Sequence, residues 1–130
     1  MLGLGADLVE ISRVGALLRR HGSRFRDRVF SAAELGGAWS GDTGDEAAAL
    51  AGIWAAKEAF LKALGAAAAG VPLSAIEVDA VDEVGEAAGR APVLRLRGAA
   101  VGSLEAMGGR SAHLSLARAG DWAAALVAID

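Results

Sequence analysis

The chain has 130 residues, of which 22% are charged and 54% hydrophobic, so it is one globular domain's length of chain and not a disordered segment. It has no cysteine, which excludes a disulfide framework and a thiolate metal site and suits a cytoplasmic protein. The net charge of −3 argues against a nucleic-acid binder. We expect no signal peptide, because the segment around Asp7 has no basic leader, and no transmembrane helix, because no charge-free apolar run reaches about 18 residues.

Residues 2–9 alternate in a way that predicts a strand. Its leucines share one face, which we expect to form part of the core. The other face carries Gly3, Gly5 and Asp7. The two glycines would leave open space beside the Asp7 carboxylate, where a ligand or another backbone could approach.

A helix is predicted next, from the N-cap Ser12 to His21, with Gly22 as its end. Residues 13–28 contain six arginines and one aspartate, a charge of +5, which leaves −8 on the rest of the chain. A basic helix on an acidic protein indicates an acidic partner that docks at one place. A solvated arginine face is the alternative interpretation.

Farther along, a capping-box spacing at Ser31–Glu34 predicts a short helix, and a polar loop is expected over 40–45. The strongest helix prediction covers 46–64, with Gly65 as its C-cap.

The remainder predicts strands and one further helix. The strands are expected at 75–81, 93–97, 111–117 and 122–129, with a hairpin loop over 84–91, a turn at 118–121 and a helix over 99–107. The order is one strand, three helices, two strands, a helix and two strands. This order predicts one α+β domain over residues 1–130, with a mainly antiparallel sheet packed on the long helix.

Chemistry could be carried by the long helix. Glu58 and Lys62 are four residues apart and share a face that Lys57 borders. Alone, such a pair could simply support the helix by ~0.3 kcal/mol. Asp7 favours a functional interpretation, because an Asp and a Glu from two elements can bind Mg²⁺ together with water and substrate phosphate oxygens. Lysines beside the ion would neutralise phosphate charge, so the residues indicate phosphoryl-type transfer, provided that Asp7 and Glu58 lie close together. No zinc site is predicted, and His113 is interpreted as a partly buried structural histidine.

Four segments resemble the holo-acyl-carrier-protein synthases, which are small bacterial 4′-phosphopantetheinyl transferases. They are GLGADLVEISR (3–13), FSAAE (30–34), WAAKEAFLKALG (54–65) and HLSL (113–116), in the family's order. The resemblance implies the 4′-phosphopantetheinyl transferase fold. It also implies the reaction, in which the phosphopantetheine group of coenzyme A passes to a serine of an acyl carrier protein and adenosine 3′,5′-bisphosphate is released.

The resemblance also implies roles for individual residues. Asp7 and Glu58 would hold Mg²⁺. Glu58 would accept the serine proton, directly or through a metal-bound water, and Lys62 would stabilise the leaving phosphate or donate a proton to it. Asp7, Glu58 and Lys62 would thus be the catalytic residues. Coenzyme A would contact Lys57, Lys62 and Arg90.

The partners follow from the same resemblance. The acidic recognition helix of the carrier protein would dock on the first helix, and the arginines expected to receive it are Arg13, Arg20 and Arg24. The family implies a homotrimer with coenzyme A bound between subunits.

The chain departs from the family pattern around the nucleotide site. Ile53 replaces a common arginine, and Ala66–Ala69 follow Gly65 where relatives have Gly-Thr-Gly. Arg90 lies in Gly-Arg-Ala-Pro, where relatives have Gly-Lys-Pro. Ala117-Arg118 replaces a common Ser-His. These departures motivate an alternative, a catalytically weakened paralogue that binds carrier protein.

Overall fold

The computed structural model describes residues 1–36, 45–82 and 90–130, without the side chains of 80–82 and 90. The strands are β1 (Gly3–Glu10), β2 (Ile76–Asp82), β3 (Arg90–Leu96), β4 (Ala112–Ala119) and β5 (Trp122–Ile129). The helices are α1 (Ile11–His21), α2 (Ser23–Val29), α3 (Ala32–Leu35), α4 (Glu46–Leu64) and α5 (Ala99–Ala106), with 3₁₀ turns η1 (Gly65–Ala68) and η2 (Leu73–Ala75).

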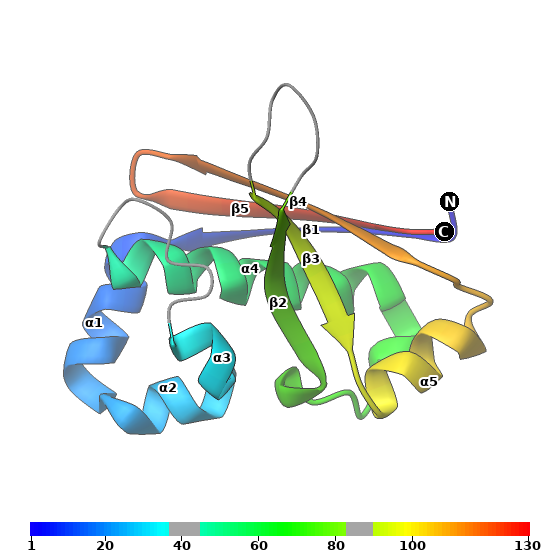
Figure 1. Cartoon of the computed structure of the whole chain (residues 1–130), viewed down its shortest axis with the longest axis horizontal. Coiled ribbons are helices and arrows are strands. Elements are labelled where there is room, and N and C mark those ends of the chain that lie inside the picture. Colours follow the sequence, from blue (N-terminus) through cyan, green and yellow to red (C-terminus); the bar gives the residue numbers. More distant parts are fainter. Residues whose placement is uncertain (37–44, 83–89) are drawn as a thin grey trace.

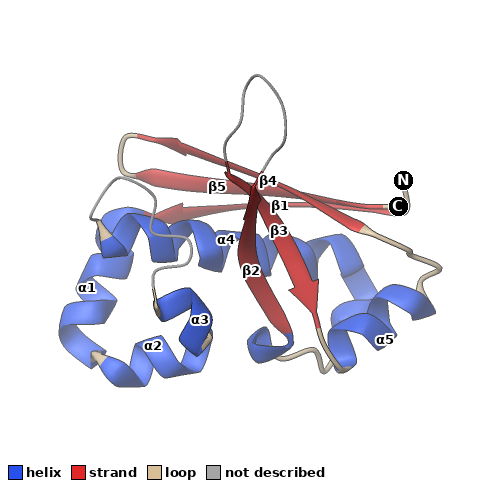
Figure 2. Cartoon of the chain, in the orientation of Figure 1, coloured by secondary structure: helices blue, strands red, loops and turns tan. Residues whose placement is uncertain are grey.

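The strands form two antiparallel sheets, which confirms the α+β prediction. The larger sheet has the order β1-β5-β4, and β2 pairs with β3 in the smaller one. Helix α4 packs along the larger sheet, with α1–α3 near one of its ends and α5 near the other (Figure 1). The helices lie on one side of the long strands (Figure 2), and both chain termini lie at the same end of this sheet, where Gly3 is opposite Ile129.

Helix α4 has the predicted bounds. The Asp45 side chain accepts a hydrogen bond from the amide of Ala48, and Gly65 ends the helix with a φ of 59°. Ile53 and Phe60 on this helix are fully buried. The helix therefore forms the centre of the core and can hold its polar side chains at fixed positions.

Strand β1 packs on α4 through its glycines. A Cβ atom on Gly5 would lie 2.0 Å from the carbonyl oxygen of Ala59, so the two backbones touch where only glycine fits. The prediction that the leucine face is buried is wrong, because Leu4 is 57% and Leu8 65% exposed. Alternation shows that a strand has two faces, but the close backbone approach decides which of them points inward.

The first helical region differs from its prediction in two ways. Helix α1 begins at Ile11 and not at Ser12, since Ser12 lies in the first turn and its hydroxyl is bonded to the carboxylates of Glu10 and Asp121. Gly22 ends α1 as predicted, but the chain turns at once into α2, which was not predicted. A seven-residue helix has little stability of its own, and α2 depends on tertiary contacts.

The remaining predicted elements are present, with boundaries that differ by a few residues. The capping box at Ser31–Glu34 opens α3, and the final hairpin turns at Gly120-Asp121. The predicted loops at 40–45 and 84–91 lie almost entirely outside the described residues. Within the described ranges, no helix has the length and apolar character needed to cross a bilayer.

Candidate active site

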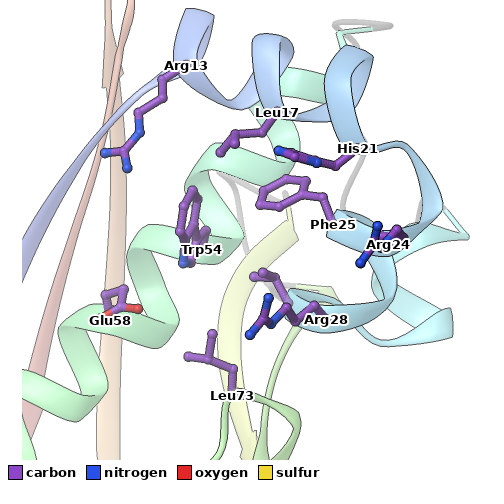
Figure 3. A pocket seen from close by; sticks show the side chains of 10 residues that line it. Arg13, Leu17, His21, Arg24, Phe25, Arg28, Trp54, Glu58 and Leu73 are labelled. Carbon is purple, nitrogen blue, oxygen red and sulfur yellow. The ribbon is translucent and has the colours of Figure 1, made fainter.

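A cleft of about 520 Å³ opens between α1, α2, α4 and η2 (Figure 3). Its lining residues are Arg13, Leu17, His21, Arg24, Phe25, Arg28, Val29, Trp54, Glu58 and Leu73. They come from segments far apart in the sequence, so the cleft exists only in the folded chain.

The cleft combines an apolar floor with a basic rim. The rings of Phe25 and Trp54 meet edge to face, with centroids 5.5 Å apart. Arg13 extends from α1 on one side, while Arg24 and Arg28 extend from α2 on the other (Figure 3). Such a surface favours an anionic partner that also inserts an apolar group.

The indole nitrogen of Trp54 adds a polar feature to this floor. It is buried and has no hydrogen-bond partner among the described residues. Buried polar groups are normally hydrogen-bonded, so this nitrogen is an unsatisfied donor beside the cleft.

Asp7 and Lys62 form a close ion pair on the β1-facing side of α4. The Nζ atom of Lys62 lies 2.6 Å from Oδ1 of Asp7 and 3.1 Å from the carbonyl oxygen of Ala6. Lys62 follows Glu58 by one helical turn, so this contact puts Asp7 and Glu58 on the same side of α4.

Glu58 lies at the edge of the cleft, below Arg13 and Trp54 in Figure 3. Its side chain has no hydrogen-bond or ion-pair partner in the described part of the chain. The same part contains no group of three or more residues that could hold a metal ion. Asp7 and Glu58 could therefore supply only part of a coordination sphere, which is how Mg²⁺ is usually bound when phosphate oxygens and water complete it.

Comparisons with known proteins identify the family. The sequence profile of the 4′-phosphopantetheinyl transferase superfamily matches residues 3–127. The holo-[acyl-carrier-protein] synthase of Solidesulfovibrio magneticus is 40% identical over 137 residues, covering 98% of this chain and 97% of that protein. The chain belongs to the 4′-phosphopantetheinyl transferase superfamily.

Solved structures agree with this assignment. The holo-[acyl-carrier-protein] synthase of Neisseria meningitidis has a TM-score of 0.78 and 26% identity, covering 100% of this chain and 98% of that one. The synthase in the coenzyme A complex from Chronobacterium ammoniagenes has a TM-score of 0.73 and 35% identity, with coverages of 98% and 96%. The chain is thus a phosphopantetheinyl transferase with the fold that its motifs predict.

Lys57 does not reach the surface of the transferase. Its side chain is 1% exposed, and its Nζ atom donates to Oε1 of Glu34 and to the carbonyl oxygen of Val29, both at 2.7 Å. The predicted contact of Lys57 with coenzyme A therefore stays a prediction, and it would require the ammonium to leave this buried pair. Its position one residue before Glu58 turns it to the interior, about 100° around the helix from the Glu58 face.

The structure separates the other predicted binding residues. Arg13 and Arg24 line the cleft, whereas Arg20 is exposed but does not line it. The Arg90 side chain lies outside the described parts, so its contact with coenzyme A stays a prediction. Arg28 was missed, although its spacing of four from Arg24 could have indicated a shared helix face.

The departures from the family pattern fall at different depths. Ile53 is fully buried in the core, so its side chain offers no contact to a ligand. Ala66–Ala69 follow α4 in and after the turn η1, with Ala66 and Ala69 exposed. His113 is exposed and paired with the Ser111 hydroxyl, so the interpretation as a partly buried histidine is wrong.

Away from the cleft, a surface ion pair joins α2 to the start of α4. Arg26 Nε lies 2.9 Å from Oε1 of Glu46. This hydrogen bond raises the pKa of Arg26 and lowers the pKa of Glu46. The pair therefore supports the folded state above the ordinary pKa of a glutamate, and this support is lost as the pH falls through the lowered value.

Proposed function

We propose that this chain transfers the 4′-phosphopantetheine group of coenzyme A to a serine of an acyl carrier protein in a Mg²⁺-dependent reaction, with the ion held by Asp7 and Glu58. The observation that carries the proposal is the Asp7–Lys62 pair on the Glu58 side of α4, beside a cleft with a basic rim. Family membership supplies the reaction. One related structure is named as a complex with coenzyme A, which supports this donor.

The residues at this site fit a hard cation. Asp7 already has a positive group, the Lys62 ammonium, at 2.6 Å, and Glu58 is available as a second carboxylate. A bound Mg²⁺ would neutralise charge on the phosphate oxygens of coenzyme A. Besides holding this ion, the chain must accept the serine proton and stabilise the leaving group.

Glu58 and Lys62 suit these two tasks. As the serine oxygen bonds to the β-phosphorus of coenzyme A, the Glu58 carboxylate accepts the serine proton. The bond from that phosphorus to the oxygen of the α-phosphate breaks, and adenosine 3′,5′-bisphosphate leaves. Lys62 stabilises the negative charge that develops on the leaving phosphate.

The carrier protein would dock over the cleft. Arg13, Arg24 and Arg28 would face acidic side chains of its recognition helix, while Phe25 and Trp54 would receive an apolar side chain. Arg20 would contribute at the margin of this surface. The charge of the 13–28 segment would also speed the encounter with an acidic partner.

The exposed face of the larger sheet supports a homotrimer. Its large apolar side chains are Leu4, Leu8, Trp122 and Leu126, each at least 46% exposed. A contiguous apolar surface of this kind marks an interaction site. We propose that this face joins three copies of the chain and that coenzyme A binds between the subunits. We also propose a cytoplasmic location, which the absence of cysteine suits.

The test is conversion of an apo acyl carrier protein to its holo form with Mg²⁺ and coenzyme A, measured as a mass gain on the serine peptide. Asp7→Asn and Glu58→Gln should each abolish the gain, because each removes a metal-binding charge. Glu105→Gln, an exposed carboxylate on α5, is the matched control and should convert normally.

Two results would count against the proposal. Full conversion by the Asp7→Asn variant would refute the metal assignment. Failure of the wild-type chain with several carriers at high coenzyme A, together with retained carrier binding in calorimetry, would favour the weakened paralogue.

A further inference from the structure

The interior holds a charged pair that the proposed reaction does not use. Lys57 and Glu34 are both buried, and their side chains lie 2.7 Å apart. Glu34 Oε1 also accepts from the amide of Ser31 at 2.8 Å, and Oε2 accepts from the amide of Val78 at 2.7 Å. With the bond from Lys57 to the Val29 carbonyl oxygen, the pair makes directional contacts to α2, α3, α4 and β2.

Stability alone does not account for such a pair. Removing two charges from water costs several kcal/mol per ion, and apolar residues of similar volume often serve as well or better. A buried ion pair can instead specify one arrangement of the elements it joins. The relevant question is which arrangement this pair specifies.

The contacts of the pair lead to three walls of the cleft. Val29 ends α2, which carries Arg24 and Arg28, and Val29 itself lines the cleft. Lys57 lies on α4 between the lining residues Trp54 and Glu58. Glu34 holds β2, which follows the turn η2 and its lining residue Leu73.

The other contacts between α2 and α4 leave freedom of position. Phe25 meets the Trp54 ring edge to face, a contact that tolerates sliding, and Arg26 and Glu46 pair on the exposed surface. The bond from Lys57 to the Val29 carbonyl oxygen is short, at 2.7 Å, and lies out of reach of water, so it restricts the distance between α2 and α4 more tightly. The bond to Glu34 holds the Lys57 ammonium in place for this contact and fixes α3 against α4.

We infer that Lys57 and Glu34 are positioning residues, which set the distance between the arginine wall of α2 and the Trp54–Glu58 wall of α4 so that the recognition helix of the carrier fits between them. The inference rests on the proposed docking of the carrier in this cleft. The pair should affect the binding of the carrier and not that of coenzyme A. Its hydrogen bonds reach the two walls of the cleft where the carrier would dock, and they do not involve Asp7 or Lys62.

The test uses the double variant Lys57→Met/Glu34→Gln, which removes both charges without leaving one buried alone. Transfer is measured with carrier varied at saturating coenzyme A, and then with coenzyme A varied at saturating carrier. The KM for carrier should rise by about tenfold, which corresponds to about 1.4 kcal/mol of lost docking contacts when one wall shifts. The kcat and the KM for coenzyme A should change far less. Arg26→Met/Glu46→Gln is the matched control, since it removes a charged pair between the same helices at the surface, and its KM for carrier should stay close to that of the wild type.

Each outcome decides the inference. An unchanged KM for carrier in the folded double variant, or equal losses for both substrates, would overturn it. If the double variant shows no cooperative unfolding transition, the single variant Glu34→Asp, which keeps the charge but shortens the reach, is measured in the same way and judged by the same split. A wild-type chain that transfers nothing would instead refute the proposed function, so the two failures can be told apart.

Discussion

The ammonium group of Lys62 lies where a metal ion bound to Asp7 would compete with it. The two side chains are 2.6 Å apart, and the Asp7 side chain is 15% exposed, so their attraction is only partly screened. A cation that binds Asp7 must therefore displace the lysine or share the carboxylate with it. The cost of this displacement lowers the affinity of the site for the cation.

Replacing Lys62 with Met should strengthen Mg²⁺ binding while it slows transfer. The variant loses a competing positive charge at Asp7, and we expect the Kd for Mg²⁺ to fall by about tenfold, from the loss of roughly 1.4 kcal/mol of competing interaction. Transfer slows because the leaving phosphate loses its cation. Calorimetric titration with Mg²⁺ gives the affinity without any turnover. Arg110→Met is the control, because Arg110 is exposed and outside the site, and it should leave the affinity for Mg²⁺ unchanged. Weaker Mg²⁺ binding by the Lys62→Met variant would contradict the competition between Lys62 and the ion.

The residues that we propose to be catalytic could be selected from the sequence, because they are close in the chain or lie in a recognisable motif. Glu58 and Lys62 share a helix face by spacing, and Asp7 stood out as an acid on a glycine-bearing strand. The burial of Lys57 could not be predicted in the same way. It depends on Glu34 and Val29, which are 23 and 28 residues away, and only the folded chain brings them together.

At the scale of elements, the contact between β1 and α4 decides how the sheet sits on the long helix. The glycines of β1 allow backbone to touch backbone, and the leucines consequently face outward. A pattern of period two identifies the strand but does not rank its two faces when one is made of leucine and the other of glycine. Helix α2 was missed for a related reason, since its place is set by contacts of Phe25 with Trp54 and not by its own propensity.

Gly5→Ala should destabilise the fold strongly, because the added methyl carbon would lie 2.0 Å from the Ala59 carbonyl oxygen and one of the two elements must move. We expect a loss of about 2–4 kcal/mol in the free energy of unfolding, measured by urea denaturation. Gly102→Ala is the matched control. Gly102 lies within α5, and apart from its chain neighbours and the backbone of its own helix no atom lies within 4 Å of the added carbon, so that variant should gain about 0.5–1 kcal/mol. Equal stabilities of the two variants would contradict the close packing of β1 on α4.

At the scale of the whole molecule, the outward leucines raise the question of what covers the larger sheet. Leu4 and Leu8 of β1 and Leu126 and Trp122 of β5 lie on its outer face, where Leu126 is opposite Ala6, diagonal to both leucines of β1. Leaving this area in water forgoes the free energy that its burial would release. A ring of copies that contact one another through this face would remove the face from water. The number of subunits in such a ring is fixed by the rotation that relates one copy to the next.

Leu8→Glu should therefore dissociate the homotrimer that we propose. Leu8 is 65% exposed in the single chain, so the new charge costs the isolated subunit little, but it would be buried without a partner in the assembled sheet face. We expect the mass from light scattering to fall from three chains to one, with transfer falling alongside because coenzyme A would bind between subunits. Ala33→Glu places the same charge on an exposed position of α3 and should leave the mass unchanged. A Leu8→Glu variant that keeps the wild-type mass would show that this face is not the interface, and a wild-type chain with the mass of one subunit would refute the trimer itself.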